Sequence, residues 1–136
     1  MQTFCGCSGL KSVVLPESLT GMGSSEFAHC SSLTSVELPE GLTSIGTAAF
    51  QDCSSLTSVE IPENVTSISG LAFCGCTSLT ELTLSENLAH LRSETFDNCP
   101  DLVLTVKEGS HAENYCKKEE LKYVVNGKVP GTVWAK

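Results

Sequence analysis

Lysine and arginine are absent from Ser12 to Leu91, a segment that holds nine acidic residues. The whole chain has a formal net charge of −8, and six of its eight basic residues lie from Lys107 onward. A body of this charge repels phosphate groups and anionic lipid headgroups. The sequence therefore argues against nucleic-acid binding and against binding to an anionic membrane surface.

Two kinds of hydrophobic segment are also missing. No stretch approaches the roughly 20 apolar residues of a membrane-spanning helix. The opening residues MQTFCGCSGLK lack the basic start and the long apolar run of a signal peptide. From the residues alone, we expect the chain to be either cytosolic or a piece of a longer, exported protein.

Aromatic residues make up only 6% of the chain, but five of them are evenly spaced. Phenylalanine recurs at one constant interval, and the stretch CSSLTSVELPE at Cys30–Glu40 returns as CSSLTSVEIPE at Cys53–Glu63. A fixed period of roughly 20–50 residues is typical of stacked repeat proteins. The two most regular columns are Phe4, Phe27, Phe50, Phe73 and Phe96, and Cys7, Cys30, Cys53, Cys76 and Cys99.

The apolar spacing changes within each unit. The alternating segment 36–38 predicts a short strand, and Pro39 ends it because proline cannot donate to a sheet. The i, i+3 spacing of Phe50, Cys53 and Leu56 favours a tight helical turn. One such coil cannot fold alone, since about six buried side chains contribute roughly 9–18 kcal/mol, against roughly 23–46 kcal/mol for ordering its backbone. The coils must therefore stack on one another.

The stretch LTSVELPEGLTSIGTAAFQDCSSL resembles the BspA-like, TpLRR-type leucine-rich repeats. The resemblance covers Phe4 to about Val106, and the tail EGSHAENYCKKEELKYVV is similar to the usual ending of such arrays. It implies an α/β repeat fold: a right-handed leucine-rich-repeat solenoid of about five 23-residue coils with a C-terminal cap. It also implies a non-enzymatic protein-binding or adhesion module, at the cell surface or secreted as part of a longer chain, with a host or matrix protein as its partner.

We expect two parts in the chain, a solenoid over residues 1–108 and a cap over residues 109–136. Ser110 and Glu113 have the spacing of a capping box, which predicts a short helix starting near His111. The segment LKYVVNGKVPGTVW, with its Asn-Gly pair, predicts a strand, a turn at Asn126-Gly127 and a second strand. The apolar stripe of the helix, which would cover the last coil, is Ala112, Tyr115 and Cys116.

Nothing comparable covers the first coil at the N-terminal end. The apolar side chains that would be bare there are Phe4, Leu10, Val13 and Leu15. Bare apolar edges favour association. We therefore expect either further repeats before this segment or a homodimer through the N-terminal coil. The homodimer gives the alternative function, a structural, self-associating repeat fragment.

The cysteine column predicts a ladder of reduced, structural thiols, because parallel side chains fit disulfide geometry badly. The C-G-C motifs at 5–7 and 74–76 lie three coils or about 15 Å apart, too far for one zinc site. A bridge between two chains through Cys5 or Cys74 stays an alternative. The three histidines fall in different columns, and no hydrolase, P-loop or zinc-protease motif is present. We expect no catalytic residue, no metal and no cofactor.

Acidic residues also fall into columns. Glu37 and Glu60 are predicted to point outward from adjacent strands, and the residue after each proline position is Glu17, Glu40, Glu63 or Glu86. Two interpretations stay open: a solvated face that keeps the protein soluble, and a binding face for a basic patch on a protein, with or without Ca²⁺. The predicted binding face consists of Ser35, Glu37, Ser58, Glu60, Glu81 and Thr83.

Overall fold

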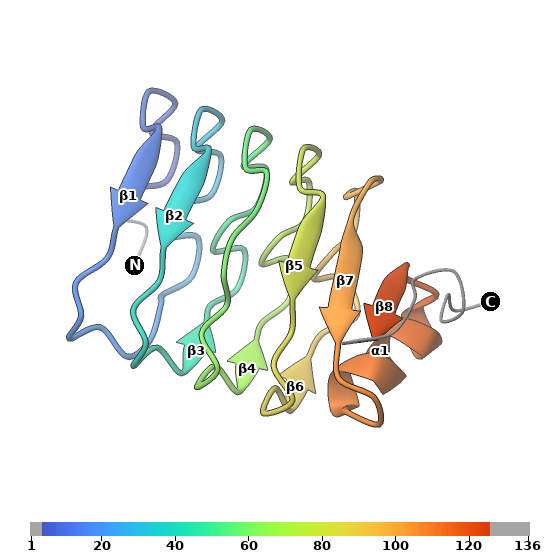
Figure 1. The fold of residues 1–136 in the computed structure, drawn as a ribbon. Coiled ribbons are helices and arrows are strands. Elements are labelled where there is room, and N and C mark those ends of the chain that lie inside the picture. Colours follow the sequence, from blue (N-terminus) through green and yellow to red (C-terminus); the bar gives the residue numbers. More distant parts are fainter. Residues whose placement is uncertain (1–3, 126–136) are drawn as a thin grey trace.

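The computed structural model describes residues 4–125, which form an elongated stack of coils (Figure 1). The elements are β1 (Ser12–Val14), β2 (Ser35–Glu37), β3 (Ser44–Ile45), β4 (Ser67–Ile68), β5 (Glu81–Thr83), β6 (His90–Leu91), β7 (Val103–Val106), α1 (His111–Glu119) and β8 (Tyr123–Val125). Within residues 4–125, no helix is both long enough and apolar enough to span a bilayer.

The strands lie in two rows along the stack (Figure 1). One row contains the parallel pair β1–β2 and the parallel sheet β5–β7–β8, and the other is the sheet β3–β4–β6. Ser12 pairs with Ser35, and Ser44 pairs with Ser67, so each residue meets its equivalent in the next repeat. The predicted solenoid, with about five coils at a 23-residue spacing, is confirmed. Glu81 pairs with Val103, one position short of the full repeat, because the last coil is contracted.

The phenylalanine column forms a continuous ring stack through the core. Neighbouring rings are 5.2–5.8 Å apart between centroids and lie within 11° of parallel. The stack ends on Tyr115 of α1, whose ring meets Phe96 edge-on at 6.3 Å. The rings in the middle of the stack, such as Phe50, are fully buried. This column therefore joins consecutive coils and ties the last one to the cap.

The cysteine column runs beside the rings. The Cys53 thiol donates to the carbonyl oxygen of Phe27, one coil back, at 3.1 Å. Cys30, Cys76 and Cys99 make the same bond to the preceding phenylalanine carbonyl, at 3.0–3.1 Å. All eight cysteines are free thiols in the structure. The column thus satisfies one backbone acceptor per coil as well as filling space, a role that the repeat pattern did not reveal.

A further column, which the repeat pattern did not predict, has left-handed backbone geometry. Its members have φ angles between 60° and 80°. Each of the first four donates its amide to a carbonyl oxygen of the next coil, at 2.7–2.9 Å. Glycine, asparagine, aspartate and histidine tolerate this region best, and the column contains only these types: Gly6, His29, Asp52, Gly75 and Asn98.

Gly75→Ala tests this column. Its φ is +80°, and an added Cβ would overlap Oδ1 of Asp52 in the coil below. We expect the free energy of unfolding to fall by about 2–3 kcal/mol in a urea titration, because a left-handed alanine alone costs about 1–2 kcal/mol. Gly6→Ala is the matched control, since its φ is +78° and nothing lies within 4 Å of the added carbon. A loss no larger in Gly75→Ala than in the control would contradict the steric argument.

The cap begins where the capping box predicted. Ser110 is the N-cap of α1 and its hydroxyl accepts the amide of Glu113 at 3.1 Å. The Glu113 carboxylate accepts from the amide of Gly109 at 2.8 Å, one residue earlier than in the usual reciprocal box. The predicted apolar stripe of the helix is buried. α1 therefore closes the end of the solenoid.

The segment after α1 adds one more strand to the solenoid. β8 pairs in parallel with β7, from Leu104–Tyr123 to Val106–Val125, and so continues the first row of strands. The first strand of the predicted hairpin is thus present, while its Asn126-Gly127 turn and second strand lie outside the described residues. The division of the chain at residue 108 stays a prediction.

Candidate functional site

The predicted binding residues lie together on the outer surface of the first row of strands, which we call the strand face. In β2, Ser35 and Glu37 flank the buried Val36, and in β5, Glu81 and Thr83 flank a buried leucine. Because side chains alternate along a strand, burial of the central residue turns its two neighbours outward. All six predicted residues of the face are exposed: Ser35, Glu37, Ser58, Glu60, Glu81 and Thr83.

The backbone ladder of this face is interrupted at the third coil. Thr57 and Ser58 contact the fourth coil through one hydrogen bond and one isolated bridge, Ser58 with Glu81. Within the described part of the chain, no backbone hydrogen bond joins residues 57–61 to residues 34–38. By contrast, β1–β2 and β5–β7 are regular ladders. The face is therefore open between its second and third coils.

Two hollows at this interruption share Glu60 as a lining residue. The one between the second and third coils has a volume of about 340 Å³ and is lined by Ser35, Glu37, Leu38, Ser58, Val59 and Glu60. The other has a volume of about 370 Å³ and extends over three coils, from Leu38 and Glu40 through Ile61 and Glu63 to Thr83. Each combines buried aliphatic side chains with exposed carboxylates. The strand face is therefore both hollowed and acidic.

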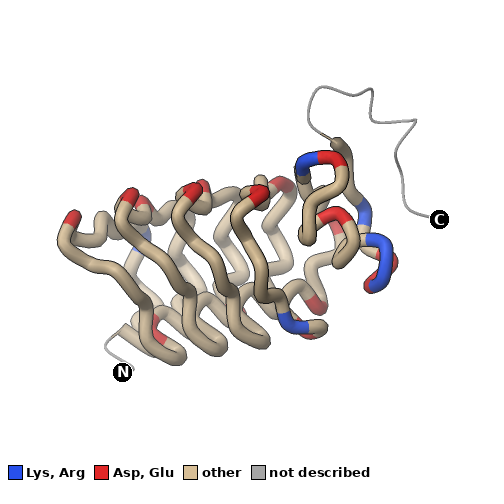
Figure 2. The backbone as a smooth tube through the Cα atoms, turned by 90° about the horizontal axis from the view of Figure 1, so that it is seen from below, with Lys and Arg blue, Asp and Glu red and all other residues tan. Residues whose placement is uncertain are grey.

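A further line of carboxylates follows the end of each strand, and we call it the corner row: Glu17, Glu40, Glu63 and Glu86. Figure 2 shows acidic residues repeating from coil to coil along one edge of the stack. Only Glu86 has a cationic partner, the Lys107 ammonium at 2.8 Å, among the ion pairs of residues 4–125. Hydrogen bonding and attraction to this carboxylate raise the pKa of Lys107. Attraction to Glu63 also contributes to the raised pKa of Lys107, but Glu17, Glu40 and Glu63 form no ion pair within residues 4–125.

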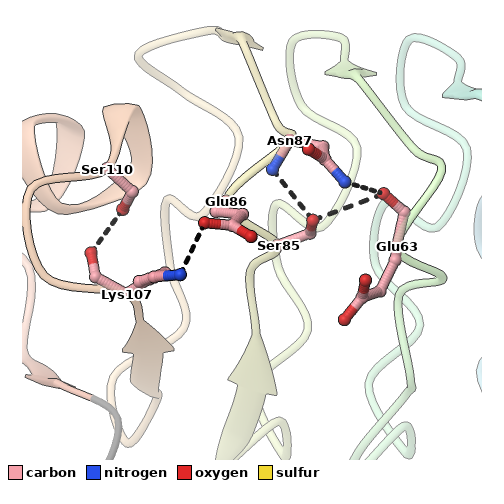
Figure 3. A network of polar contacts seen from close by, with 6 residues as sticks. All are labelled: Glu63, Ser85, Glu86, Asn87, Lys107 and Ser110. Atoms are coloured by element: carbon pink, nitrogen blue, oxygen red, sulfur yellow. Dashed lines mark hydrogen bonds and ion pairs between the residues drawn. The ribbon is translucent and has the colours of Figure 1, made fainter.

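Asparagine and serine side chains hold the corners in place. Asn87 donates from Nδ2 to the carbonyl oxygen of Glu63 at 3.1 Å, and Asn64 makes the same bond to Glu40 at 3.0 Å. Ser85, which replaces the proline of earlier coils, donates to the same Glu63 carbonyl at 3.3 Å (Figure 3). These bonds fix the backbone under the corner row. Asparagine recurs at the 23-residue interval directly after the corner glutamate, at Asn64 and Asn87, and this signal in the sequence could have indicated the bond.

The structure brings one histidine to an acidic group. Nδ1 of His29 lies 3.2 Å from Oδ2 of Asp52, one coil along the same left-handed column. Cys74, the nearby thiol of the second C-G-C motif, has its pKa raised, chiefly by burial and then by Asp52. A raised pKa is the opposite of what an activated thiol nucleophile needs. Within residues 4–125, no three histidine, cysteine, aspartate or glutamate side chains converge as a metal site would require.

The N-terminal edge is partly open. Phe4, Leu10, Val13 and Leu15 are half-buried and pack against the core, while Phe27, Leu33 and Val36, the equivalents of the first three one coil later, are buried. Phe4 keeps one ring neighbour, Phe27, at 5.2 Å. The apolar side chains of the first coil therefore pack against the second coil, and they are partly exposed on the side that faces away from it.

The coil geometry, with a short strand, a proline or serine corner and a column of stacked phenylalanines, defines a leucine-rich-repeat solenoid. Residues 1–106 match the BspA type leucine rich repeat region, in six copies. The chain belongs to this family, whose repeat arrays are typically protein-interaction modules. A search of curated proteins gave no match.

Three solved structures illustrate the likeness. The leucine rich repeat protein of T. pallidum (TpLRR) is 32% identical, with a TM-score of 0.75, over 76% of this chain and 49% of that one. A leucine-rich repeat protein from Bacteroides ovatus is 30% identical, with a TM-score of 0.80, over 91% and 32%. A leucine rich cell surface protein from Faecalibacterium prausnitzii is 27% identical, with a TM-score of 0.55, over 74% and 33%. The chain thus spans half or less of the length of these proteins.

Proposed function

We propose that this chain is a non-enzymatic protein-binding or adhesion module whose strand face receives the partner. The proposal is supported by three features that occur together on this surface: the open ladder, the two hollows, and the carboxylates of Glu37 and Glu60, which form no ion pair within residues 4–125. An extended repeat surface suits a macromolecular partner, because it offers a broad area and no enclosed pocket. The partner is a host or matrix protein with a basic patch.

The proposed location is the cell surface, as part of a longer chain. Support comes from the family, and from the F. prausnitzii relative, which is described as a cell surface protein. The acidic strand face fits this role, since it would favour cationic partners and repel polyanions.

The strand face is tested by Glu37→Ala/Glu60→Ala. Loss of two carboxylates from the open part of the face is expected to weaken binding to a matrix protein by about tenfold, measured by surface plasmon resonance on a panel of immobilised, purified matrix proteins. The matched control is Glu94→Ala/Asp97→Ala, which removes the same charge from the turn that carries Phe96. Unchanged affinity in the strand-face variant, for a protein that binds wild type, would refute the proposal.

A second candidate function is self-association through the N-terminal edge, favoured by the half-buried apolar residues there. If this edge forms a homodimer, Leu10→Glu should convert it to a monomer, because a carboxylate in an apolar interface lacks a partner. Light scattering after size exclusion, with and without reductant, measures the mass. Glu37→Ala/Glu60→Ala serves as the control and should leave a dimer intact. A monomeric wild type at its highest soluble concentration excludes this candidate, and a dimer split by reductant points instead to Cys5 or Cys74.

A further inference from the structure

One line of outward-pointing side chains on the strand face changes from apolar to acidic to polar along the stack. It consists of Val14, Glu37, Glu60 and Thr83, which we call the axial row. Val14 and Glu37 are direct partners in the β1–β2 ladder. Val14 is 70% exposed, and it is the only large hydrophobic residue within residues 4–125 with such exposure. An apolar contact point therefore stands at one end of the row, and two carboxylates follow it.

The spacing of this row favours a helical partner. The phenylalanine rings of the first three coils are 5.2 and 5.6 Å apart between centroids, so Val14 in the first coil and Glu60 in the third are separated by roughly 11 Å along the stack. Side chains at i and i+7 of an α-helix are about 10.5 Å apart along its axis, with i+3 or i+4 between them. An extended segment places i and i+4 about 13 Å apart. The helix therefore matches the spacing of the coils to within about 1 Å, whereas the extended segment differs from it by about 2 Å.

We infer that the strand face binds an amphipathic, basic helix lying along the stack, with an apolar residue on Val14 and lysine or arginine on Glu37 and Glu60. This inference rests on the proposed function and names the partner chemistry for the same face. Charge complementarity selects the cations, because the face has acidic side chains at Glu37, Glu60 and Glu81 and the sequence from Ser12 to Leu91 contains no lysine or arginine.

The hollows of the strand face can accommodate long cationic side chains. The hollow between the second and third coils places Glu37 and Glu60 beside the aliphatic side chains of Leu38 and Val59. Lysine and arginine bury their methylene stems on apolar surface while their charged heads stay near carboxylates. Lys107 on Glu86 shows the same pairing within the chain, at 2.8 Å (Figure 3).

Three synthetic peptides of equal composition test the inference. The first is an alanine-rich, lactam-stapled helix with leucine at i and lysine at i+4 and i+7. The second is a stapled helix with the same residues on three different faces, and the third is an unstapled peptide with lysine at i+2 and i+4. Fluorescence anisotropy gives the affinity of each for wild type, for Glu37→Gln/Glu60→Gln, for Val14→Ser and for the control Glu94→Gln/Asp97→Asn.

The patterned helix is expected to bind wild type about fivefold to tenfold more tightly than the scrambled helix. Glu37→Gln/Glu60→Gln should abolish this preference, Val14→Ser should reduce it, and the control should keep it. Equal binding of the two helices, or tighter binding of the extended peptide, would overturn the inference. Should that occur while a matrix protein still depends on Glu37 and Glu60, only the helical geometry is wrong. Should matrix binding also be indifferent to these carboxylates, the proposed function is wrong as well.

Discussion

Raising the pH above about 9 is expected to lower the free energy of unfolding by up to about 5–6 kcal/mol per pH unit, through four thiols of strongly raised pKa that each contribute at most about 1.4 kcal/mol. Burial raises the pKa of Cys53 and of Cys116 from 9.0 to about 12 and that of Cys99 to about 11, and it raises the pKa of Cys76 as well. In the unfolded chain these thiols ionise near 9.0, whereas in the folded chain they stay protonated. Their contribution is therefore fully present below pH 9 and is lost as the pH rises toward 12.

Urea unfolding in the presence of reductant, repeated at several pH values from about 8 to about 10.5, measures this slope. Cys53→Ala/Cys76→Ala is the informative variant, because it removes two of these four thiols. Its stability at neutral pH will be lower, but its slope above pH 9 should fall to about half of the wild-type slope. A wild-type slope that the double substitution leaves unchanged would show that other groups drive alkaline unfolding.

Phe50→Ala is expected to cost about 3–5 kcal/mol of the free energy of unfolding, the range observed when a fully buried aromatic ring is replaced by alanine. Phe50 stacks on Phe27 at 5.6 Å and on Phe73 at 5.4 Å, so its loss leaves a cavity with a ring on each side. In a repeat protein each coil is stabilised by its two neighbours. The substitution therefore weakens both interfaces of the third coil.

Phe4→Ala is the matched control for this prediction. Phe4 carries the same ring at the edge of the stack, is half-buried and has one ring neighbour. Its replacement should cost about 1 kcal/mol, since part of the ring is already in water. Urea unfolding measures the loss of free energy of unfolding in each variant. Equal losses for Phe50→Ala and Phe4→Ala would contradict the conclusion that rings inside the stack stabilise the solenoid more than a ring at its edge.

Much of the fold could be predicted because the repeat is a physical requirement. Residues that face the core at one level must match those above and below them, so the columns of Phe50 and Cys53 recur at a constant interval. For the same reason Val36 and Leu82 are expected inside and their neighbours on the strand face, and the structure confirms this placement. Ser110 and Glu113 likewise marked the start of α1, because capping depends on local spacing.

Other features depend on contacts between coils that local patterns do not record. The pair of His29 with Asp52, and the overlap that forbids a side chain at Gly75, follow from left-handed corners lying directly above one another. The thiol of Cys53 meets a carbonyl 26 residues away, an offset that differs from the repeat length itself. Each becomes apparent only when the path of the whole coil is known.

Two segments of identical local sequence adopt different structures in adjacent coils. Residues 35–37 and 58–60 are both Ser-Val-Glu, yet the first segment is strand β2 and the second forms only an isolated bridge. By itself the sequence determined a stack of repeated coils, its core columns and an acidic outer surface. Only the tertiary structure decided that the ladder opens beside Glu60 and leaves hollows there. The reason is that a strand forms when amides and carbonyls of adjacent coils align, and that alignment is set by both neighbours together rather than by the segment's own residues.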